Sequence, residues 1–487
     1  MITSTDKILK RLLAVVAVFY IALFVYVALS RIGYPFELEW MEGGSVEHVD
    51  RIMQGKEIYT PPSIEFIPYI YTPLYYYVSI PLAETLGVSL LPLRIVSLAS
   101  TLALFFVIFL FVKKETASWY FGLIAAGLFA ATYRIGGAWF DLARVDMLHL
   151  LLLMIAFYLL RFNKTPLAYV IAAVVAGLSF LTKQTAAMIF LPVGIYLLIK
   201  ERKISWYFNI IFALIVIATT SYYTSTTDGW YYFWNFVLPA DHRWTKKVFI
   251  LFWTYDLIRP FSIAILLTLA FMGYLKKRDG ERFWFYFSFF VGVIFTSWFA
   301  RLHYGGYANV LIPVYLLLSV VAVLGLKEVL DHADDFNKKA AVVVILNLSI
   351  LFQFIALLYS PRNQIPTKAD EQAGWELVEK LKSFDGDCYI FSNIYLARLA
   401  GKKVYTHGML IFDLMQSNTK YNKFIEKEFE DALKSHKFDV ILDYAQMDIA
   451  FLLKYYKIKE PAFKDKKVFL MRTGFTTRPE HILVPKK

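Results

Sequence analysis

Long apolar stretches recur along the first 360 of the 487 residues of this chain, and short polar segments separate them. Each stretch is close to the ~20 residues that a helix needs to cross a hydrocarbon core of roughly 30 Å. The pattern therefore predicts an α-helical polytopic membrane protein with eleven spans. We expect them near residues 12–30, 92–112, 117–133, 144–161, 167–181, 185–199, 204–223, 254–275, 283–300, 307–326 and 340–359.

Basic segments between the apolar stretches predict the orientation. Lys7, Lys10 and Arg11 precede the first stretch, and further basic segments lie at 113–116 and 327–339. Because cytoplasmic loops are enriched in Lys and Arg, we expect a cytoplasmic N-terminus in the plasma membrane. The outer segments are then 31–91, 134–143, 182–184, 224–253, 301–306 and the region after about 360.

One apolar segment breaks this alternation. "YTPLYYYVSIPLAETLG" (71–87) looks apolar enough to span, but a span here would move every later basic loop to the outer face. We therefore predict that it does not cross the membrane. A hairpin or shallow helix on the outer face is expected instead, because Pro73 and Pro81 limit its helices.

The composition supports a membrane protein and excludes several other classes. The chain is 58% hydrophobic and 18% charged, whereas soluble domains are nearer 45–50% apolar and about 25% charged. The net charge of +12 is explained largely by basic cytoplasmic loops, so it is no argument for nucleic acid. The single cysteine, Cys388, excludes an intrachain disulfide and a cysteine-rich metal site.

The region after residue 360 has a different pattern. Short apolar runs alternate with helix-like stretches such as "DEQAGWELVEKLK" (370–382). This alternation predicts a small α/β extracytoplasmic domain with a partly parallel sheet. The expected domains are thus 1–360 and 361–487. The runs are "CYIFS" (388–392), "KVYTH" (403–407), "DVILD" (439–443) and "VFLMR" (468–472).

Carboxylates are dense in the first outer segment. Glu37, Glu39 and Glu42 lie in "ELEWMEGG" (37–44), and "EGGSVEHVDRIMQG" (42–55) is expected to form a short helix. Glu39 and Glu42 share a face if this stretch is helical. Two carboxylates here could hold a cation, or one could accept a proton from a hydroxyl. They could equally be a solvated helix start, because acids favour the first turn.

A second acidic segment leads into the fourth predicted span. Asp141, Arg144 and Asp146 lie here, and Asp146 would be inside the bilayer boundary. A carboxylate at that depth is costly and indicates function. Alternatively, Arg144 simply neutralises it. His149, one turn further on, is interpreted as a packing residue.

Three cations lie on the expected outer face. Lys183 is in a short turn, Arg301 begins "RLHYGGY" together with His303 and Tyr304, and Arg94 opens the second span. A fixed cation at this face suits a lipid phosphate, and the planar fork of Arg301 matches phosphate oxygens. With the acids, they predict a site for an anionic lipid headgroup.

Four stretches, in this order and spacing, resemble the GT-C glycosyltransferases, in particular the protein O-mannosyltransferases and the lipid A aminoarabinose transferase group. Together they cover roughly residues 8–330. Where the family often has an adjacent Asp-Glu pair, this chain has Met41-Glu42, which leaves the identity of the base and the need for a divalent metal ion open. The stretches are "EWMEGGSVEHVDRIMQGKEIY", "YTPLYYY", "LPLRIVSLAS", and "ARVDMLHLLLL" followed by "GLSFLTKQ".

The resemblance implies a membrane enzyme that transfers a sugar from a polyprenyl-phosphate donor to a lipid, glycan or protein acceptor on the outer face. It implies that Lys183 holds the lipid phosphate and that Asp146 is the second-loop acid. We expect Glu39 or Glu42 to accept the acceptor's proton in a single, inverting displacement. The other candidates for substrate binding are Arg301, His303, Tyr304, Arg94 and Asp141.

Two other classes stay open from the sequence. A transporter or lipid flippase predicts acids or interrupted helices at the membrane midplane, often with inverted repeats, and neither is evident. A non-catalytic subunit of a cell-surface glycan assembly would leave the acids and cations unexplained. The depth of Asp146 and Lys183 discriminates between enzyme and transporter, because the enzyme requires them at the membrane rim.

Overall fold

The computed structural model describes residues 4–332 and 339–486, so positions 333–338 of the predicted basic loop lie outside the described residues. Within the described ranges, one helix coincides with each predicted span. These helices are α1 (Ser4–Arg31), α4 (Leu90–Thr116), α5 (Trp119–Ala131), α6 (Asp146–Phe162), α7 (Pro166–Thr182), α8 (Ala186–Lys200), α9 (Arg202–Thr226), α13 (Arg259–Arg278), α14 (Gly280–Leu302), α15 (Ile312–Asp331) and α16 (Lys339–Ala356).

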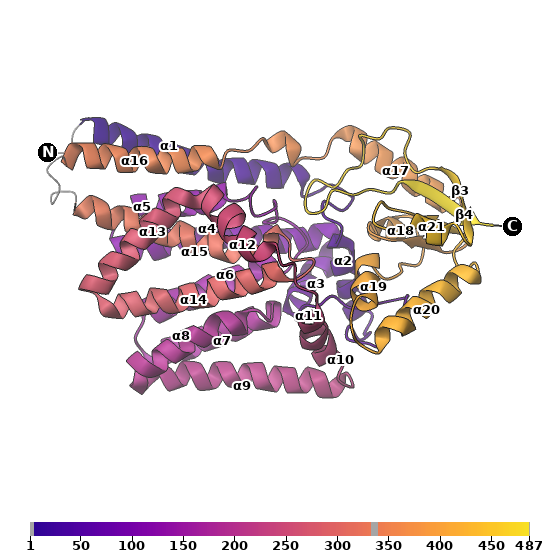
Figure 1. Ribbon diagram of the computed structural model, residues 1–487, viewed down its shortest axis with the longest axis horizontal. Helices are drawn as coiled ribbons and strands as arrows, with labels where there is room; N and C mark the ends of the chain where they lie inside the picture. Colours follow the sequence, from indigo (N-terminus) through magenta and orange to yellow (C-terminus); the bar gives the residue numbers. More distant parts are fainter. Residues whose placement is uncertain (1–3, 333–338, 487) are drawn as a thin grey trace.

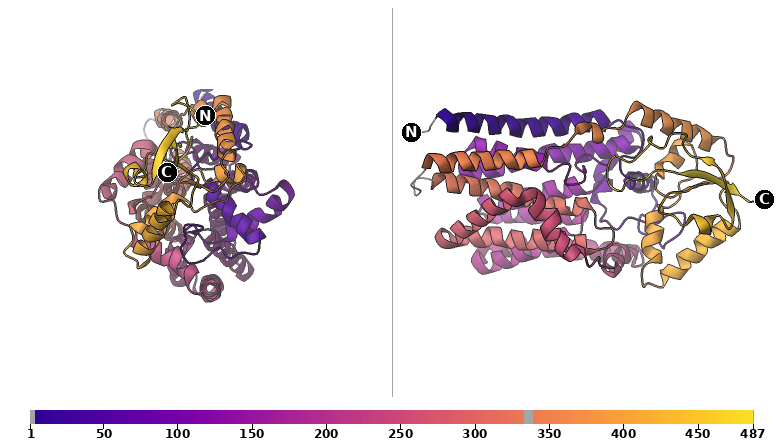
Figure 2. Two further views of the ribbon diagram at one scale, coloured as in Figure 1. Left: turned by 90° about the vertical axis from the view of Figure 1, so that its right-hand side faces the viewer. Right: turned by 45° about the horizontal axis from the view of Figure 1, so that its top comes forward.

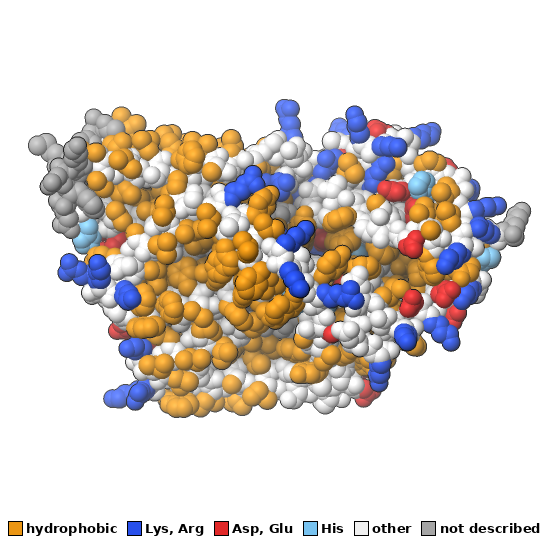
Figure 3. Space-filling model, viewed as in Figure 1, with side chains coloured by type: hydrophobic (Ala, Val, Ile, Leu, Met, Phe, Trp, Pro, Cys, Tyr) orange, Lys and Arg blue, Asp and Glu red, His pale blue; other side chains and the backbone are white. Residues whose placement is uncertain are grey.

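The helices form a bundle that confirms a multi-pass membrane protein. Seven of the described helical segments are long and apolar enough to cross a membrane, and α5, α7 and α8 are shorter apolar helices. The apolar window of Ala308–Asp331, which contains α15, is 89% buried, whereas that of α9 is only 11% buried. α15 therefore lies at the centre of the bundle and α9 at its edge. In Figure 3, hydrophobic side chains cover most of the visible surface of the bundle.

The two ends of the bundle differ. The N-terminus lies at one end, and the C-terminal domain covers the other in both side views (Figures 1 and 2). The N-terminal end of α1 and this domain therefore lie at opposite ends of the membrane-spanning bundle. Which side is cytoplasmic stays a prediction from the basic loops.

The segment at 71–87 forms the short helix that its prolines predicted. α3 (Leu74–Leu86) has 13 residues and contains Pro81, so it is about 20 Å long at 1.5 Å per residue. That length is short of the roughly 30 Å of a hydrocarbon core, but α5 also has only 13 residues. That the segment 71–87 does not cross the membrane therefore stays a prediction. The first outer segment also contains the predicted helix, α2 (Glu42–Met53), and α3 packs against both α2 and α4.

The C-terminal domain contains a four-stranded, partly parallel sheet, as predicted. Its strand order is β1-β2-β4-β3; β1 pairs parallel with β2, and the other two pairs are antiparallel. The strands are β1 (Cys388–Ile390), β2 (Val440–Leu442), β3 (Tyr456–Pro461) and β4 (His481–Pro485). The helices are α17 (Lys368–Lys382), α18 (Tyr395–Leu399), α19 (Gly408–Met415), α20 (Tyr421–Lys434) and α21 (Ile449–Leu452).

Two of the apolar runs are irregular segments and not strands. In 403–407, Thr406 donates its backbone N–H to the carbonyl of Ile64 at 3.0 Å. In 468–472, the N–H of Phe469 donates to Asp370 at 2.8 Å. Because partners outside the sheet satisfy these backbone groups, neither run needs a neighbouring strand.

The first outer segment and the C-terminal domain share one core. Val46 and Ile64 belong to the same buried cluster as Tyr389 and Leu410. The division of the chain at residue 360 therefore stays a prediction. The other elements on this side of the bundle are α10 (Trp230–Tyr232), η1 (Phe233–Val237), α11 (Leu238–Asp241), α12 (Val248–Leu251), η2 (Phe252–Ile258), η3 (Ala308–Leu311) and η5 (Pro361–Asn363).

Candidate active site

Glu42 and Arg94 form a fully bonded, buried ion pair. The guanidinium donates from Nε and Nη2 to the two carboxylate oxygens at 2.9 and 2.7 Å. The backbone N–H groups of Leu38 and Ala143 donate to the same carboxylate. Burial alone would raise the pKa of Glu42, but Arg94 and these amides more than offset it, so the pKa lies below its usual value.

The remaining nitrogen of Arg94 is also occupied. Nη1 donates to the carbonyl of Tyr34 at 2.6 Å, and Nη2 also donates to that of Phe36 at 2.7 Å. The pair thus joins α4 to the first outer segment and to the loop before α6. Neither side chain has a free polar atom to offer a substrate.

Asp141 has a similar set of contacts at the end of α1. Arg31 donates from Nε and Nη2 to its two oxygens at 2.7 and 2.6 Å, and the Tyr133 hydroxyl adds a third bond at 3.0 Å. Both charged side chains are buried. The geometry joins the second acidic segment to α1.

Glu39 is buried but only partly bonded. Its Oε2 accepts from the Met41 N–H at 3.2 Å and from Arg144 Nη1 at 3.4 Å. Its Oε1 is buried and has no hydrogen-bond partner in the described part of the chain. Burial raises the pKa of Glu39 to about 7, against the opposing effect of Arg144. A carboxylate with this pKa and an open oxygen can accept a proton near neutral pH.

Lys183 and Asp146 form a second charged group. Asp146 is the first residue of α6, and Lys183 follows the last residue of α7. Lys183 Nζ donates to Asp146 Oδ1 at 2.7 Å, and Asn309 Nδ2 donates to the same oxygen at 3.2 Å. Among the described residues, Asp146 Oδ2 has no partner.

A small cavity adjoins this pair, and four of the residues that line it have a polar atom without a partner in the described part of the chain. Asp146, His149, Thr296 and Ser297 all line the cavity together with Lys183. One side-chain polar atom of each of the first four is buried and unbonded within the described ranges. Each such group costs about 1–3 kcal/mol when it stays unsatisfied. A cluster of four therefore indicates that water or a polar ligand group fills this space.

The pair lies at the rim of the bundle. Both residues are at helix ends on the side of the first outer segment, because the next residue, Gln184, donates to the carbonyl of Ile70 at 2.8 Å. This is the placement that the enzyme interpretation requires and the transporter interpretation does not.

Tyr71 and Arg144 bring Glu39 and Lys183 into one site. Arg144 Nη2 donates to the Tyr71 hydroxyl at 2.9 Å, while Arg144 Nη1 contacts Glu39. Lys183 Nζ lies 5.8 Å from the centre of the same Tyr71 ring. Neither Tyr71 nor Arg144 was singled out as a site residue from the sequence. Two sequence signals could have pointed to them: Tyr71 is the first residue of "YTPLYYY", and Arg144 is a cation two residues before Asp146.

The candidates Arg301, His303 and Tyr304 near the end of α14 have contacts of their own. Arg301 donates to Asp256 at 2.9 Å and to the carbonyl of Gly306 at 2.5 Å. His303 Nδ1 pairs with the carbonyl of Phe299 at 2.7 Å. Tyr304 lines a separate cavity against the C-terminal domain. A phosphate contact from Arg301 would therefore have to compete with Asp256.

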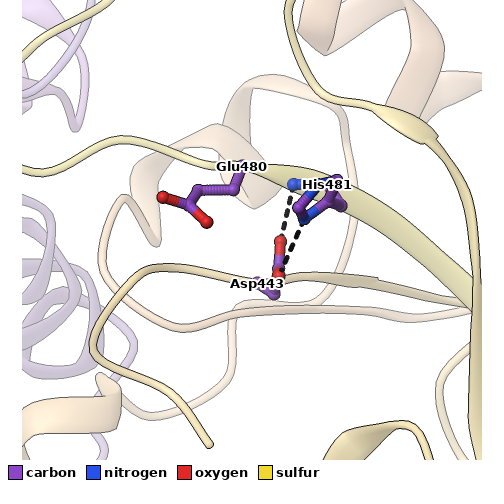
Figure 4. A group of neighbouring side chains, drawn as sticks. All are labelled: Asp443, Glu480 and His481. Carbon is purple, nitrogen blue, oxygen red and sulfur yellow. Dashed lines mark hydrogen bonds and ion pairs between the residues drawn. The ribbon is translucent and has the colours of Figure 1, made fainter. Parts of the chain in front are cut away.

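Glu39 and Glu42 together offer one open oxygen to a divalent ion, because Glu42 is fully used. This is too few for an all-protein Ca²⁺ site of six to eight oxygens, whereas Mg²⁺ is usually bound by one or two carboxylates together with water and phosphate oxygens. Within the described ranges, the one group of three close metal-ligand side chains is Asp443, Glu480 and His481 in the C-terminal domain. There Asp443 already bonds the backbone and the ring of His481 (Figure 4). A divalent ion stays a prediction from the sequence, and we derive no step through it.

Comparisons with known proteins agree with this fold. Residues 71–223 match the family model of the dolichyl-phosphate-mannose-protein mannosyltransferases. No curated protein sequence matches the chain. Among solved structures, ArnT from Cupriavidus metallidurans bound to undecaprenyl phosphate has a TM-score of 0.58 at 12% identity, over 96% of this chain and 97% of that one.

Two further structures are similar. ArnT in the apo state has a TM-score of 0.59 at 13% identity, over 96% of this chain and 98% of that one. The archaeal oligosaccharyltransferase AglB from Archaeoglobus fulgidus, in complex with an inhibitory peptide and a dolichol-phosphate, has a TM-score of 0.50 at 13% identity. That match covers 90% of this chain and 72% of AglB.

Fold and site thus define a polytopic membrane protein with the GT-C fold, and the resemblance to this group of glycosyltransferases is confirmed. The similar structures differ in how much of their own length matches this chain. The ArnT structures match almost the full length of both chains, including the region of the C-terminal domain, whereas AglB is longer than this chain. At 12–13% identity, these likenesses establish the fold.

Proposed function

We propose that this chain is a glycosyltransferase that transfers a sugar from a polyprenyl-phosphate donor to an acceptor hydroxyl at the outer face of the plasma membrane. Glu39 is the general base, and Lys183 contacts the leaving phosphate. The N-terminus is cytoplasmic, and the C-terminal domain lies on the outer side with the site.

The observation that carries this proposal is the open oxygen of Glu39. Five glutamate and aspartate side chains in this region are buried. The two that Arg94 and Arg31 hold have every oxygen bonded, and Glu37 accepts from the backbone N–H groups of Gly43 and Tyr395. Glu39 keeps Oε1 without a partner in the described structure, and burial raises its pKa to about 7. An ideal general base has a pKa near the working pH.

The reaction is a single displacement at the anomeric carbon. The acceptor oxygen forms a bond to that carbon while its proton moves to Glu39 Oε1. The bond between the anomeric carbon and the phosphate oxygen breaks, and the phosphate leaves with the electron pair. Lys183 then stabilises the charge that develops on the phosphate. Because attack and departure occur on opposite faces, the anomeric configuration inverts.

Two features support the choice of donor. Lys183 lies beside a cavity with several unbonded polar atoms, which suits a phosphate at the membrane rim. The similar structures of ArnT and AglB hold undecaprenyl phosphate and a dolichol-phosphate, respectively. Both are lipid phosphates of the polyprenyl class. A lipid, glycan or protein hydroxyl is the acceptor.

The test is turnover of polyprenyl-phosphate sugars by purified protein in lipid. Glu39→Gln should lower kcat by about 10²–10⁴-fold, the usual contribution of a general base, while undecaprenyl phosphate still binds. Lys183→Met should lower kcat by about 10²–10³-fold, as for other groups that stabilise developing charge. Glu57→Gln is the matched control, because Glu57 is an exposed carboxylate of the same outer segment.

Full activity of Glu39→Gln would refute the assignment of the base. Absence of turnover by the wild-type protein across hexose and pentose donors would refute the proposed enzyme.

A further inference from the structure

One loop of the C-terminal domain returns to the bundle and lies on Glu39. In this loop, residues 471–477, the Thr473 N–H donates to the carbonyl of Leu38 at 3.1 Å. Arg31 Nη1 donates to the Thr473 hydroxyl at 3.2 Å, and the Tyr307 hydroxyl donates to the carbonyl of Gly474 at 2.7 Å. The loop is therefore held from α1, from the first outer segment and from the residue that precedes η3.

Gly474 lies directly against the side chain of Glu39. A Cβ atom at this position would be 3.0 Å from Glu39 Cγ, 3.5 Å from Glu39 Oε1 and 3.6 Å from the Trp139 ring. Oε1 is the oxygen that has no partner in the described residues. Gly474 thus packs directly against Glu39, and a methyl group here would crowd that side chain next to its one open oxygen.

The backbone alone does not explain this contact. Gly474 has a φ of +75°, which favours glycine, but Gly401 of the same domain has a φ of +68° with nothing within 4 Å of its Cβ position. The two glycines share the conformational constraint. They differ in whether an added methyl group would enter the space beside Glu39.

We propose that the loop 471–477 forms a wall of the acceptor site and that Gly474 determines which acceptors reach Glu39. The inference rests on the proposed function of Glu39 as the base. The acceptor hydroxyl approaches Oε1 through the space beside Gly474, so the C-terminal domain selects the acceptor while the bundle binds the donor. Gly474 is a specificity-determining residue in this arrangement.

The test compares Gly474→Ala with Gly401→Ala, which add the same methyl group at the same kind of backbone position. Both are assayed with a polyprenyl-phosphate sugar donor and with water, methanol and glycerol as acceptors of increasing size. The loss of rate in Gly474→Ala relative to Gly401→Ala should grow with the size of the acceptor and be smallest with water. With glycerol, Gly474→Ala should be at least about 10-fold slower than Gly401→Ala, because small misplacements of a reacting group reduce rates strongly.

Binding of undecaprenyl phosphate should be equal in the two variants, since the donor lies on the side of Lys183. Equal losses for all acceptors in both variants would overturn the role of Gly474, because a structural effect does not depend on acceptor size. Failure of the wild-type protein to hydrolyse or transfer any donor would instead overturn the proposed function. The two failures are therefore distinguishable.

Discussion

Two sets of buried carboxylates on the same side of the bundle differ in how their oxygens are bonded. Glu42 and Asp141 each face an arginine in two-point contact and accept further bonds. Glu39 and Asp146 are just as buried, yet each has one oxygen without a partner in the described chain. Burial alone therefore does not identify a catalytic acid. We expect the fully bonded set to support the fold and the open set to support chemistry.

The largest effect on stability should come from breaking the Glu42–Arg94 pair. Glu42→Gln or Arg94→Met leaves the other charge buried without compensation, which typically costs about 3–5 kcal/mol. The double variant should lose much less than the sum of the two single losses. Unfolding in detergent measures all three.

The control for these three variants is an ion pair on the exposed surface. Glu65 and Lys403 lie 2.7 Å apart at 49% and 44% side-chain exposure, and exposed pairs contribute at most about 1 kcal/mol. Glu65→Gln should thus have little effect. Wild-type stability of Glu42→Gln, together with lost transfer, would move the catalytic role from Glu39 to Glu42.

The pH dependence of stability should have opposite signs for the two glutamates. Burial raises the pKa of Glu39 to about 7 from 4.5, so the folded state binds this proton more tightly than the unfolded state does. The contribution of Glu39 to the free energy of unfolding is therefore present below pH 4.5 and is lost as the pH rises through 7. At 1.36 kcal/mol per pKa unit, the loss is roughly 3 kcal/mol.

Glu39→Gln stays neutral, so we expect it to be inactive but more stable than the wild-type protein at pH 8. The pKa of Glu42 is lowered by Arg94, which outweighs burial, and its contribution is instead lost as the pH falls through that pKa. Midpoints of thermal unfolding from pH 8 to well below 4.5, the usual pKa of a glutamate, measure both. A Glu39→Gln variant that is less stable at pH 8 would indicate that Glu39 has a structural role.

The same comparison explains how much of the molecule could be predicted from sequence. The bundle follows from apolar runs that are each local. β3 could not be predicted in this way, because "YKIKEP" has mostly exposed residues and its apolar alternation stops after Tyr456 and Ile458. The identity of the open carboxylate depends on distant partners. Arg94 is 52 residues from Glu42, and the amide of Ala143 is 101 residues away.

The carboxylates of the first outer segment were predicted as a group, but no local pattern separates Glu39 from Glu42. The two glutamates lie in the same stretch and have the same side chain. The difference arises only when α4 places Arg94 on one of them and the loop 471–477 covers the other. Local sequence therefore predicts where the acids gather, and tertiary contacts decide which one stays open.

The smallest effect should come from the hydroxyl that holds this loop. Tyr307→Phe removes the bond to the Gly474 carbonyl, and such a bond contributes about 0.5–1.5 kcal/mol. Global stability should change little, because Tyr307 is 40% exposed. Amide hydrogen exchange at 473–475 should become faster, and the acceptor KM should rise a few-fold while donor binding stays constant.

Tyr304→Phe is the matched control, since Tyr304 is 54% exposed and lines the separate cavity. Unchanged exchange in Tyr307→Phe would show that Thr473 alone holds the loop on Glu39. The open carboxylate would then depend on α1 and the first outer segment rather than on the residue that precedes η3.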